Sequence, residues 1–588
     1  MKCRIYILGL VFFCASAYSQ SLTGIKNHYL QVQSISAFND TVKYIHTPEA
    51  SFFEPGDKVM IIQMTGTSFI FVDERIPVDL PAANYSKYTD KNCGKYEILQ
   101  VGKIDTLQHY ILFTAEFIND YDNGEKIQLV KVIEQDTATI TGTLTAKDWN
   151  GSTGGVVAMI IRDSLTFNGN IDVSAKGFRG AQPETGYTGG CRLNVPPDTV
   201  NFLSTELNRA GNKGEGTMTT SFPYTKGAFY FASGGGGGNG RFAGGGGGSN
   251  LGQGGNGGRQ DIACGEGNEY NVRAKGGITG SPIYDTLNGN ERALLGGGGG
   301  SGVQASSTTA TKGGDGGGLV MIVADVIIAN NKSIFANGED VSATASASAG
   351  GGGAGGSVLL DVSAFRGKFN SVSVKGGKGG NTLSSTNTSL GTGGGGGGGV
   401  IKFANSSLPS NSVIVSRGEQ GYIQSGPGGT EGQPGDSGKR IGGYVALLNG
   451  FLFNSINGID TVCAGQKPTT IIGSKPKGGD GIFVFEWLRS ENKINWNSIP
   501  SSNLKDYSPP QLNTTTYFRR VVNSAGISDT SKIVEIYVYP GITNNLIFGT
   551  DSMCMGKLRF QSQDLIRQEV MEQPIRFNGK KELLMGIG

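Results

Sequence analysis

The stretch GTGGGGGGGVIKF, Gly391 to Phe403, places seven consecutive glycines directly before an apolar, strand-like run. Glycine loses more backbone freedom on folding than any other residue, so such a run is unfavourable unless the missing side chains serve a purpose. The chain holds 98 glycines in 588 residues, more than twice the average share of about 7%. Collagen is excluded because the glycines keep no strict three-residue period and only 19 prolines are present.

The opening stretch belongs to an internal repeat. Each unit has a glycine pair, an apolar strand, a short polar corner and a second strand with alternating pattern. Such units open at Gly154, Gly317, Gly355 and Gly398. Two short strands cannot bury an apolar face alone, so we predict stacked units, a β-solenoid or β-helix-like fold, over residues 151–450. The glycine pairs are expected where neighbouring coils approach closely and where corners need a positive φ.

Longer glycine runs lie between the strands. They occupy residues 234–238, 244–248, 296–300 and 393–399. One interpretation is a set of flexible linkers. The other, which we favour, is an ordered bundle of polyproline-II-like segments whose bare faces allow hydrogen bonds between backbones. Within 393–399, we assign the last pair, Gly398 and Gly399, to the opening of a repeat and the first five glycines to an insertion.

The residues before the repeats predict export and a further β-rich domain. Lys2 and Arg4, the apolar run IYILGLVFFCASA and a small-x-small cleavage site make residues 1–19 a match to a secretory signal peptide. The run is too short to span a bilayer, and no later segment is long and apolar enough to do so. Residues 20–150 contain short β runs and the hairpin signal Asn123-Gly124.

An acidic cluster in this region raises the question of a metal site. Asp120, Asp122 and Glu125 could form half of a calcium loop, but their spacing departs from the full pattern and favours a solvated turn. The three histidines of the chain lack metal-ligand spacing such as H-E-x-x-H. We therefore expect no metal and no cofactor.

The cysteines fit an exported protein. Removal of the signal peptide leaves five of them, at Cys93, Cys191, Cys264, Cys463 and Cys554. An odd number leaves at least one thiol unpaired within the chain. Cys191 and Cys264 bracket one glycine-rich insertion and are the candidate disulfide, although free thiols remain an equal alternative.

Residues 458–540 differ in composition from the repeats. Glycine becomes less frequent, tryptophan and tyrosine become more frequent, and apolar and polar residues alternate between turn signals. This pattern predicts an immunoglobulin-like β-sandwich. We expect Trp487 and Tyr517 in its core, with Tyr517 on a late strand and Phe518 pointing to the opposite face.

Two regions of the chain resemble parts of known bacterial surface proteins. The segment GGVVAMIIRDSLTFNGNIDVSAKGFRG, and GGSVLLDVSAF followed by poly-glycine, resemble the repeat region of exported, adhesin-like surface proteins from Bacteroidetes-type bacteria, over residues 20–450. Residues 458–540 resemble the tandem Ig-like modules of the same proteins, which are cargo of type IX secretion and use these modules as spacers. Ile527 stands where those modules carry a second cysteine, which implies that Cys463 lacks a partner. The glycine runs also resemble, in composition, binding regions of phage tail adhesins and of receptor ectodomains.

The tail, residues 541–588, starts like a second such module, with Cys554 in the role of Cys463. From DLIRQEVMEQ onward the pattern is lost. Codons that could encode this tail give the pattern of the module again when they are translated in a shifted reading frame. We predict that the tail is frameshifted. The resemblance implies further modules in the missing part, or a C-terminal sorting domain recognised by the secretion machinery.

The remaining patterns limit the function classes. A net charge of +2 provides no basic field for nucleic acid. Catalysis of the parallel β-helix polysaccharide lyase or hydrolase type would need residues such as Asp163, Asp325 and Asp361, although a strand end or corner is the favoured explanation of Asp361. We predict an all-β, secreted or cell-surface protein that binds glycans, matrix or cells without catalysis, with that enzyme class as the alternative.

Overall fold

The computed structural model describes most of the chain. Its described residues are 20–37, 43–47, 50–69, 88–90, 92–183, 210–218, 225–228, 232–259, 292–303, 309–383, 390–404, 407–425, 431–444, 446, 454–458, 460–476, 482–524 and 526–540. The predicted signal peptide, Cys191, Cys264 and the tail from residue 541, including Cys554, lie outside them. Within these ranges no helix is long and apolar enough to cross a membrane.

The protein is all-β, and its chain divides into two compact units. The first comprises Met1–Ser455, Ser474–Phe485 and Arg520–Lys532, and the second comprises the stretches Ile456–Gly473, Glu486–Arg519 and Ile533–Gly588.

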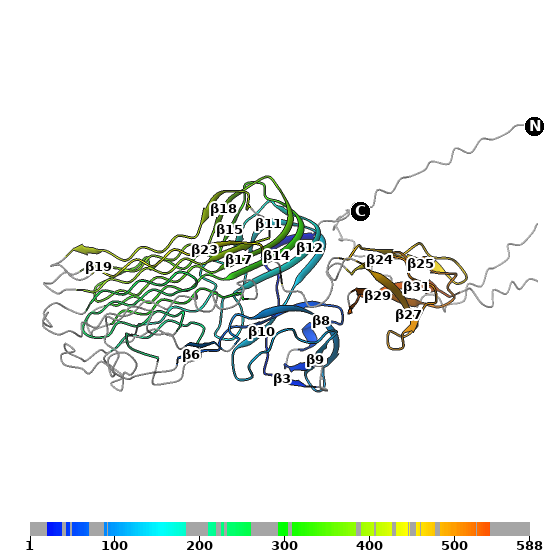
Figure 1. The fold of residues 1–588 in the computed structure, drawn as a ribbon, viewed down its shortest axis with the longest axis horizontal. Coiled ribbons are helices and arrows are strands. Elements are labelled where there is room, and N and C mark those ends of the chain that lie inside the picture. Colours follow the sequence, from blue (N-terminus) through cyan, green and yellow to red (C-terminus); the bar gives the residue numbers. More distant parts are fainter. Residues whose placement is uncertain are drawn as a thin grey trace, which may run out of the picture. The chain divides into compact units, whose positions relative to one another are not determined.

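A curled, eleven-stranded parallel sheet forms the core of the first unit (Figure 1). In order across the sheet, its strands are β21 (Ser410–Ile414), β18 (Phe369–Ser373), β15 (Ser333–Phe335), β13 (Ile171–Asp172), β11 (Ile133–Thr145), β12 (Val156–Phe167), β14 (Leu319–Ile328), β17 (Ser357–Arg366), β20 (Val400–Phe403) and β23 (Lys439–Gly442), with β1 (Gln20–Ile25) paired to β11. Each predicted repeat adds its first strand to one side of β11 and its second strand to the other.

Both faces of this sheet are covered. The first six residues of β12, VVAMII, are all buried, and they alternate between two hydrophobic clusters. Val157, Met159 and Ile161 enter one cluster, while Val156 and Ala158 enter the other. A continuous apolar run is what a parallel strand buried on both faces requires.

A second sheet lies in the same unit and is antiparallel. In order across it, the strands are β2 (Tyr29–Gln31), β10 (Ile127–Lys131), β5 (Lys58–Gln63), β8 (Tyr96–Asp105), β9 (Tyr110–Phe113), β4 (Lys43–His46) and β3 (Ser34–Ala37). Because β1 and β11 belong to the large parallel sheet, the predicted boundary at residue 150 does not separate two units.

Short elements complete the first unit. They are η1 (Ala50–Phe52), the pair β6 (Thr67–Phe69) and β7 (Tyr88–Asp90), and the parallel trio β16 (Thr344–Ala345), β19 (Asn381–Leu383) and β22 (Ile423–Ser425).

The glycine pairs that open the repeats form a backbone ladder. Ser357, Val400 and Lys439 donate their N–H groups to Gly318, Gly356 and Gly399 respectively. A Cβ on Gly356 would lie 1.9 Å from the carbonyl oxygen of Gly318, and one on Gly399 would lie 2.0 Å from that of Gly356. Close stacking of successive repeats therefore requires glycine here.

The predicted positive φ at these corners is correct only for the first repeat. Gly154 and Gly155 have φ of +115° and +78°. At Gly318, Gly356 and Gly399, φ is outside the left-handed region, so close approach alone accounts for those glycines.

The C-terminal sheet has six strands and an accompanying pair. Its strands are β25 (Asp460–Cys463), β31 (Val534–Tyr539), β29 (Thr516–Ser524), β27 (Val484–Ser490) and β28 (Asn497–Ser498), with β30 (Ile527–Thr530) on β29 and the separate pair β24 (Ile456–Asn457) and β26 (Ile472–Gly473). Trp487 is fully buried, stacks on Tyr507 and donates its indole N–H to Leu504 at 2.9 Å.

The expectation for Tyr517 was wrong. The cluster around Trp487 contains Phe518, whereas Tyr517 is half-buried on the other face of β29 with the Lys493 ammonium over its ring at 4.5 Å. Alternation along the strand sends neighbouring side chains to opposite faces, and the inward face is the one that carries Phe518.

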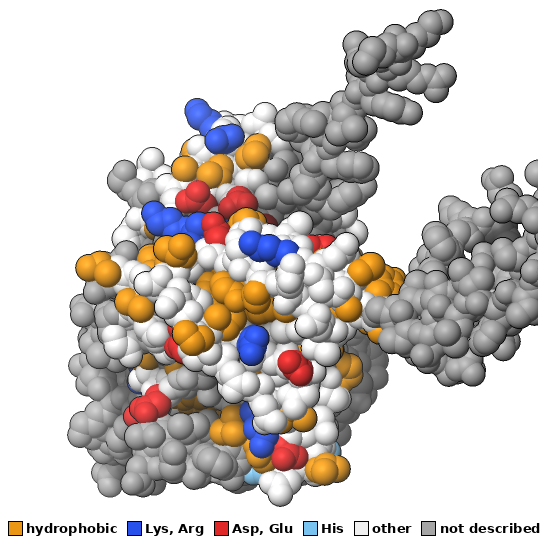
Figure 2. Space-filling view, turned by 90° about the vertical axis from the view of Figure 1, so that its right-hand side faces the viewer, with side chains coloured by type: hydrophobic (Ala, Val, Ile, Leu, Met, Phe, Trp, Pro, Cys, Tyr) orange, Lys and Arg blue, Asp and Glu red, His pale blue; other side chains and the backbone are white. Residues whose placement is uncertain are grey.

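Hydrophobic side chains also remain exposed in the second unit. Ile494 is 80% exposed, Leu504 71%, and Tyr537 and Tyr539 43% and 51%. Figure 2 faces the side of Figure 1 on which β25 and β27 are labelled, and it shows orange side chains interspersed with charged ones.

Candidate functional site

The seven glycines of residues 393–399 are ordered by hydrogen bonds to three neighbouring segments in turn. Gly394 and Gly397 donate to Gly245 and Gly248 of one glycine run. Gly395 and Gly398 donate to residues 433 and 436 of a second segment, and Gly393, Gly396 and Gly399 donate to residues 380, 377 and 374 of a third. A partner that recurs every third residue is the pattern of a polyproline-II-like helix, which has three residues per turn.

The carbonyl groups of the same run accept from three other segments. The donors lie in residues 352–355, 252–258 and 418–421, and successive carbonyls of the run accept from these three segments in turn. Six segments therefore surround this one, and the run at 296–302 is surrounded in the same way. Figure 1 shows these glycine-rich segments running side by side away from the curled sheet. The linker interpretation is excluded for the described runs.

Steric exclusion explains why every residue of this run is glycine. A Cβ on Gly394 would lie 2.1 Å from the carbonyl oxygen of Gly255, one on Gly395 2.1 Å from that of Gly418, and one on Gly396 2.0 Å from Gly353. The three faces of the segment are thus all occupied by backbone. The bundle continues through Gly398 and Gly399, so the pair that opens the repeat also belongs to the bundle.

Each segment of the bundle has three faces, and glycine occupies the faces that pack against neighbouring backbone. Residues 374–380 leave one face open, and Lys375 and Lys378 occupy it. Residues 432–438 bury a single face through Gly432 and Gly435. Lysine side chains therefore stand at a three-residue interval on the open face of residues 374–380.

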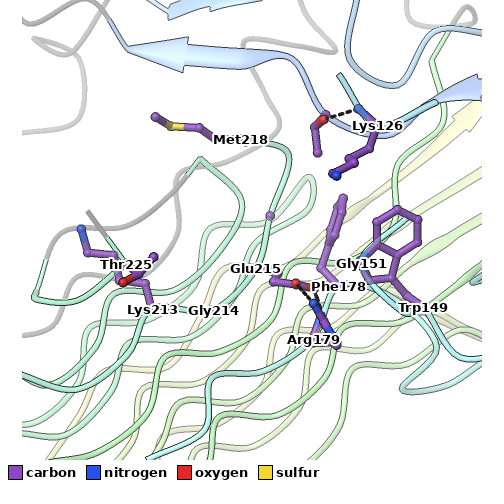
Figure 3. Close-up of a pocket in the computed structure, with 12 residues that line it drawn as sticks. Lys126, Trp149, Gly151, Phe178, Arg179, Lys213, Gly214, Glu215, Met218 and Thr225 are labelled. Carbon is purple, nitrogen blue, oxygen red and sulfur yellow. Dashed lines mark hydrogen bonds and ion pairs between the residues drawn. The ribbon is translucent and has the colours of Figure 1, made fainter. Parts of the chain in front are cut away.

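A cavity of about 400 Å³ lies between the antiparallel sheet and the glycine bundle (Figure 3). We call it the basic cavity; its lining includes Thr65, Lys126, Trp149, Gly151, Phe178, Arg179, Lys213, Gly214, Glu215, Gly216, Met218 and Thr225. Lys126 directly precedes β10, Trp149 lies between β11 and β12, and Lys213 belongs to the bundle. The site exists only because these segments meet in the fold.

Arg179 and Glu215 form a bidentate ion pair in the lining of the basic cavity. The guanidinium donates to both carboxylate oxygens, and the two backbones also bond, with Glu215 N–H donating to Arg179 at 3.0 Å. The hydrogen bond to Glu215 raises the pKa of Arg179. A bidentate pair of this kind fixes both side chains and leaves the carboxylate neutralised.

Two lysines line separate parts of the basic cavity. Figure 3 shows the Lys126 side chain directed toward Phe178, and Lys213 on the opposite side beside Thr225. Burial lowers the pKa of Lys213 to about 7, because removal from water disfavours its charged form. Within the described residues, no hydrogen-bond or ion-pair partner is present for the Lys126 ammonium.

The floor of the cavity is aromatic. Trp149 and Phe178 pack edge to face, with ring centroids 5.5 Å apart and planes at 80°. Both are buried, and they belong to the hydrophobic cluster under the large sheet. The floor is therefore rigid and contributes apolar surface.

The carboxylates predicted for an enzyme are only partly brought together. Asp163 and Asp325 lie on the adjacent strands β12 and β14, at the register shift between them, and both are exposed. Burial is the largest effect that raises the pKa of Asp163. The negative charges of Asp136 and Asp325 raise it further. Asp361 is buried on β17 and accepts a hydrogen bond from Ala446 N–H at 3.2 Å. It does not join the other two.

In the acidic turn, the carboxylates of Asp122 and Glu125 accept hydrogen bonds from other side chains of the protein. Asp122 accepts from Gln63 and Asn92, each at 3.3 Å, and Glu125 accepts from the Thr65 hydroxyl at 2.7 Å. The described part of the chain holds no group of three His, Cys, Asp or Glu side chains that could bind a metal.

His28 and Cys93 make side-chain contacts within the fold. His28 lines a second cavity of about 250 Å³ and stacks on Phe52 with ring centroids 6.2 Å apart. Cys93 is buried, and its thiol donates to the Met64 carbonyl at 3.3 Å, while Cys463 is exposed. Neither forms a disulfide with a described residue.

Sequence reasoning missed the basic cavity. Lys126, Arg179 and the pair Lys213 and Glu215 come from three separate stretches, and none stands in a recognisable motif. Only the charged residues Lys213 and Glu215, which interrupt the glycines in GNKGEG, offered a signal.

The fold and this cavity define an all-β protein in which a hydrogen-bonded glycine bundle extends from a curled parallel sheet. A family described as a domain of unknown function (DUF8696) matches residues 453–540, the region of the C-terminal sheet. No curated protein and no solved structure matches the chain.

Proposed function

We propose that the protein is exported and acts at the cell surface or in the medium as an adhesin-like protein, binding glycans, matrix or other cells without catalysis. The repeats and bundle form a β-solenoid that presents the binding surface. Residues 458–540 form an Ig-like module that serves as a spacer. The secretion machinery would recognise a C-terminal region.

One observation carries this proposal: the bundle holds outward side chains at fixed positions on a backbone bonded in several directions. Lys375 and Lys378, for example, stand on a segment whose glycines bond to two neighbours. A surface ordered before binding loses little conformational entropy when a partner docks, which favours recognition of extended ligands.

Binding is tested with the full chain on a glycan array, on matrix proteins and on whole cells. We expect saturable binding to at least one of these partners. A correctly folded protein that binds none of them contradicts the proposal. N-terminal sequencing of the protein recovered outside the producing cells tests export, with Gln20 expected as the first residue.

A polysaccharide lyase or hydrolase is the second candidate, because Asp163 and Asp325 place two carboxylates on neighbouring strands. A carboxyl group with a raised pKa beside a second carboxylate is the arrangement that glycosidases use. Activity on a polysaccharide panel that disappears in Asp163→Asn would favour this candidate. If the native protein has no activity on the panel, the lyase or hydrolase candidate is rejected.

A further inference from the structure

One lysine–aspartate pair in the first unit is almost completely buried. Lys58 begins β5 and Asp529 lies in β30, and the Lys58 Nζ is 3.0 Å from the Asp529 Oδ1. Only 6% of the Lys58 side chain and 2% of the Asp529 side chain are exposed. Both residues belong to the first unit, although 471 positions separate them in the chain. Removal from water makes the charged state of such a pair costly.

Hydrogen bonds hold the backbone on both sides of this pair. The backbone carbonyl of Asp529 accepts from the Asn454 amide at 2.9 Å. The next carbonyl, that of Thr530, accepts from the Gln100 amide at 2.5 Å. Gln100 in turn lies directly opposite Lys58 in the pairing of β8 with β5. The two side chains therefore meet from fixed backbones, and reacting groups held about 3–3.5 Å apart react as if at a very high concentration.

The surroundings favour uncharged carboxyl groups. Burial is the largest effect on the pKa of Asp529 and raises it, while the charge of Lys58 acts in the opposite direction. The second carboxyl oxygen of Asp529, Oδ2, is buried and has no hydrogen-bond partner among the described residues. The charges of Lys58 and Asp529 both act on Glu134 of β11, and burial raises the pKa of Glu134. Transfer of a proton from the ammonium to a carboxyl group leaves an uncharged amine, which is a nucleophile, beside a carboxylic acid.

The neighbouring ion pairs of Asp57 provide a comparison. The Asp57 carboxylate lies 2.7 Å from the Lys131 Nζ and 3.2 Å from the Lys532 Nζ, but these lysines are 29% and 59% exposed. Burial raises the pKa of Asp57, yet the hydrogen bond to Lys131 and the charges of both lysines outweigh this effect and lower it. These pairs therefore keep their charges. Burial of the lysine, more than the distance, sets the Lys58–Asp529 pair apart.

We propose that Lys58 and Asp529 become joined by an amide bond between their side chains. The uncharged Lys58 Nζ attacks Cγ of the protonated Asp529 carboxyl group, a C–N bond forms, and the bond from Cγ to one carboxyl oxygen breaks. That oxygen leaves as water with the acid proton and one amine proton, so no oxidant, reductant or further reactant is needed. Glu134 takes the proton from the nitrogen and returns it to the departing oxygen. The bond ties β30 to β5 covalently, and its assignment does not rest on the proposed function.

The test is mass spectrometry of the full chain, intact and after digestion with a protease. We expect the intact mass to be lower by one water molecule. We also expect a linked peptide that contains both Lys58 and Asp529, with fragment ions that place the link at these two residues. Separate recovery of the two unlinked peptides, with an intact mass equal to that of the unlinked chain, overturns the inference. This measurement on the native chain does not depend on the folding of any variant.

Variants identify the reacting groups. Lys58→Arg keeps a cation beside Asp529 but removes the amine, so the linked peptide should be absent. Lys532→Ala is the matched control and should keep the link, because Lys532 pairs with Asp57. A link that persists in Lys58→Arg and is lost in Lys532→Ala would assign the bond to Asp57 and overturn the inference. Glu134→Gln should slow the appearance of the link by about tenfold or more, as loss of a proton carrier does. An unchanged rate would overturn the part assigned to Glu134.

Discussion

The backbone N–H of Gly396 donates to the carbonyl of Gly377 at 2.8 Å, and the two glycines belong to segments that run in opposite directions. Three residues earlier and later, the same two segments bond again, through Gly393 and Gly399. The intervening glycines bond elsewhere, so each segment ties several neighbours together. Stability of the bundle therefore depends on every interior position at once.

Gly396→Ala should destabilise the first unit by at least about 2 kcal/mol, since overpacking costs about 1–3 kcal/mol or more. The new Cβ would lie 2.0 Å from the Gly353 carbonyl oxygen, which is backbone and cannot move aside alone. Urea unfolding of native and variant chains measures the change. Lys375→Ala, on the open face of a neighbouring segment, is the control and should change stability by less than about 0.5 kcal/mol. Equal stability of Gly396→Ala and the native chain would contradict the packed bundle.

Lys213 should make stability depend on pH. Its folded pKa, about 7, is below its unfolded value near 10.5. Between these values the unfolded chain binds more protons than the folded one, so this lysine makes the free energy of unfolding rise with pH across that window. The buried Lys402, with a pKa of about 8, contributes in the same direction.

Lys213→Met should therefore stabilise the protein more at pH 6.5 than at pH 9, by a difference of roughly 2–3 kcal/mol. Unfolding curves of both chains at the two pH values test this. Lys126→Met removes an ammonium from the same cavity without deep burial and serves as the matched control. A Lys213→Met effect that is equal at both pH values would disprove the lowered pKa.

The two described cysteines should differ sharply in reactivity. Cys463 is exposed and should be alkylated by iodoacetamide in the folded protein within minutes, whereas Cys93 is buried and should react only after unfolding. Mass spectrometry of peptides from native and urea-treated samples distinguishes the sites. Labelling of Cys93 at the same rate as Cys463 would mean that its surroundings open readily.

Trp487 and Tyr517 should contribute unequally to the C-terminal sheet. Trp487→Ala removes a fully buried side chain and its hydrogen bond to Leu504, and should cost about 3–5 kcal/mol. Tyr517→Ala removes a half-buried ring and its contact with Lys493, and should cost about 1 kcal/mol. Denaturant unfolding followed by circular dichroism gives both values. The reverse ranking would indicate that Tyr517 is the core residue after all.

Much of the repeat architecture was predictable because its signals are local. The apolar run after Gly155 is long, continuous and rich in β-branched residues, so a buried strand follows from the pattern itself. The same holds for the strands after Gly318 and Gly356: the first pairs with β12, and the second pairs with the first.

The basic cavity was not predictable for a physical reason. Lys213 becomes a lysine with a pKa near 7 only when the fold removes water from it, and desolvation depends on segments distant in sequence. Phe518 replaced Tyr517 in the core because two adjacent ring positions on one strand are indistinguishable until the buried face is known.

The sequence by itself determined the all-β class, the repeating glycine pair and strand, and the three-residue spacing of side chains in segments such as residues 374–380. Those features are set by backbone freedom and hydrophobic periodicity, which act over a few residues. Only the tertiary structure decided which glycine segments are neighbours, and which faces of each are covered. Hydrogen bonds and carbonyl contacts between segments far apart in the chain, such as Gly394 with Gly245, made those choices.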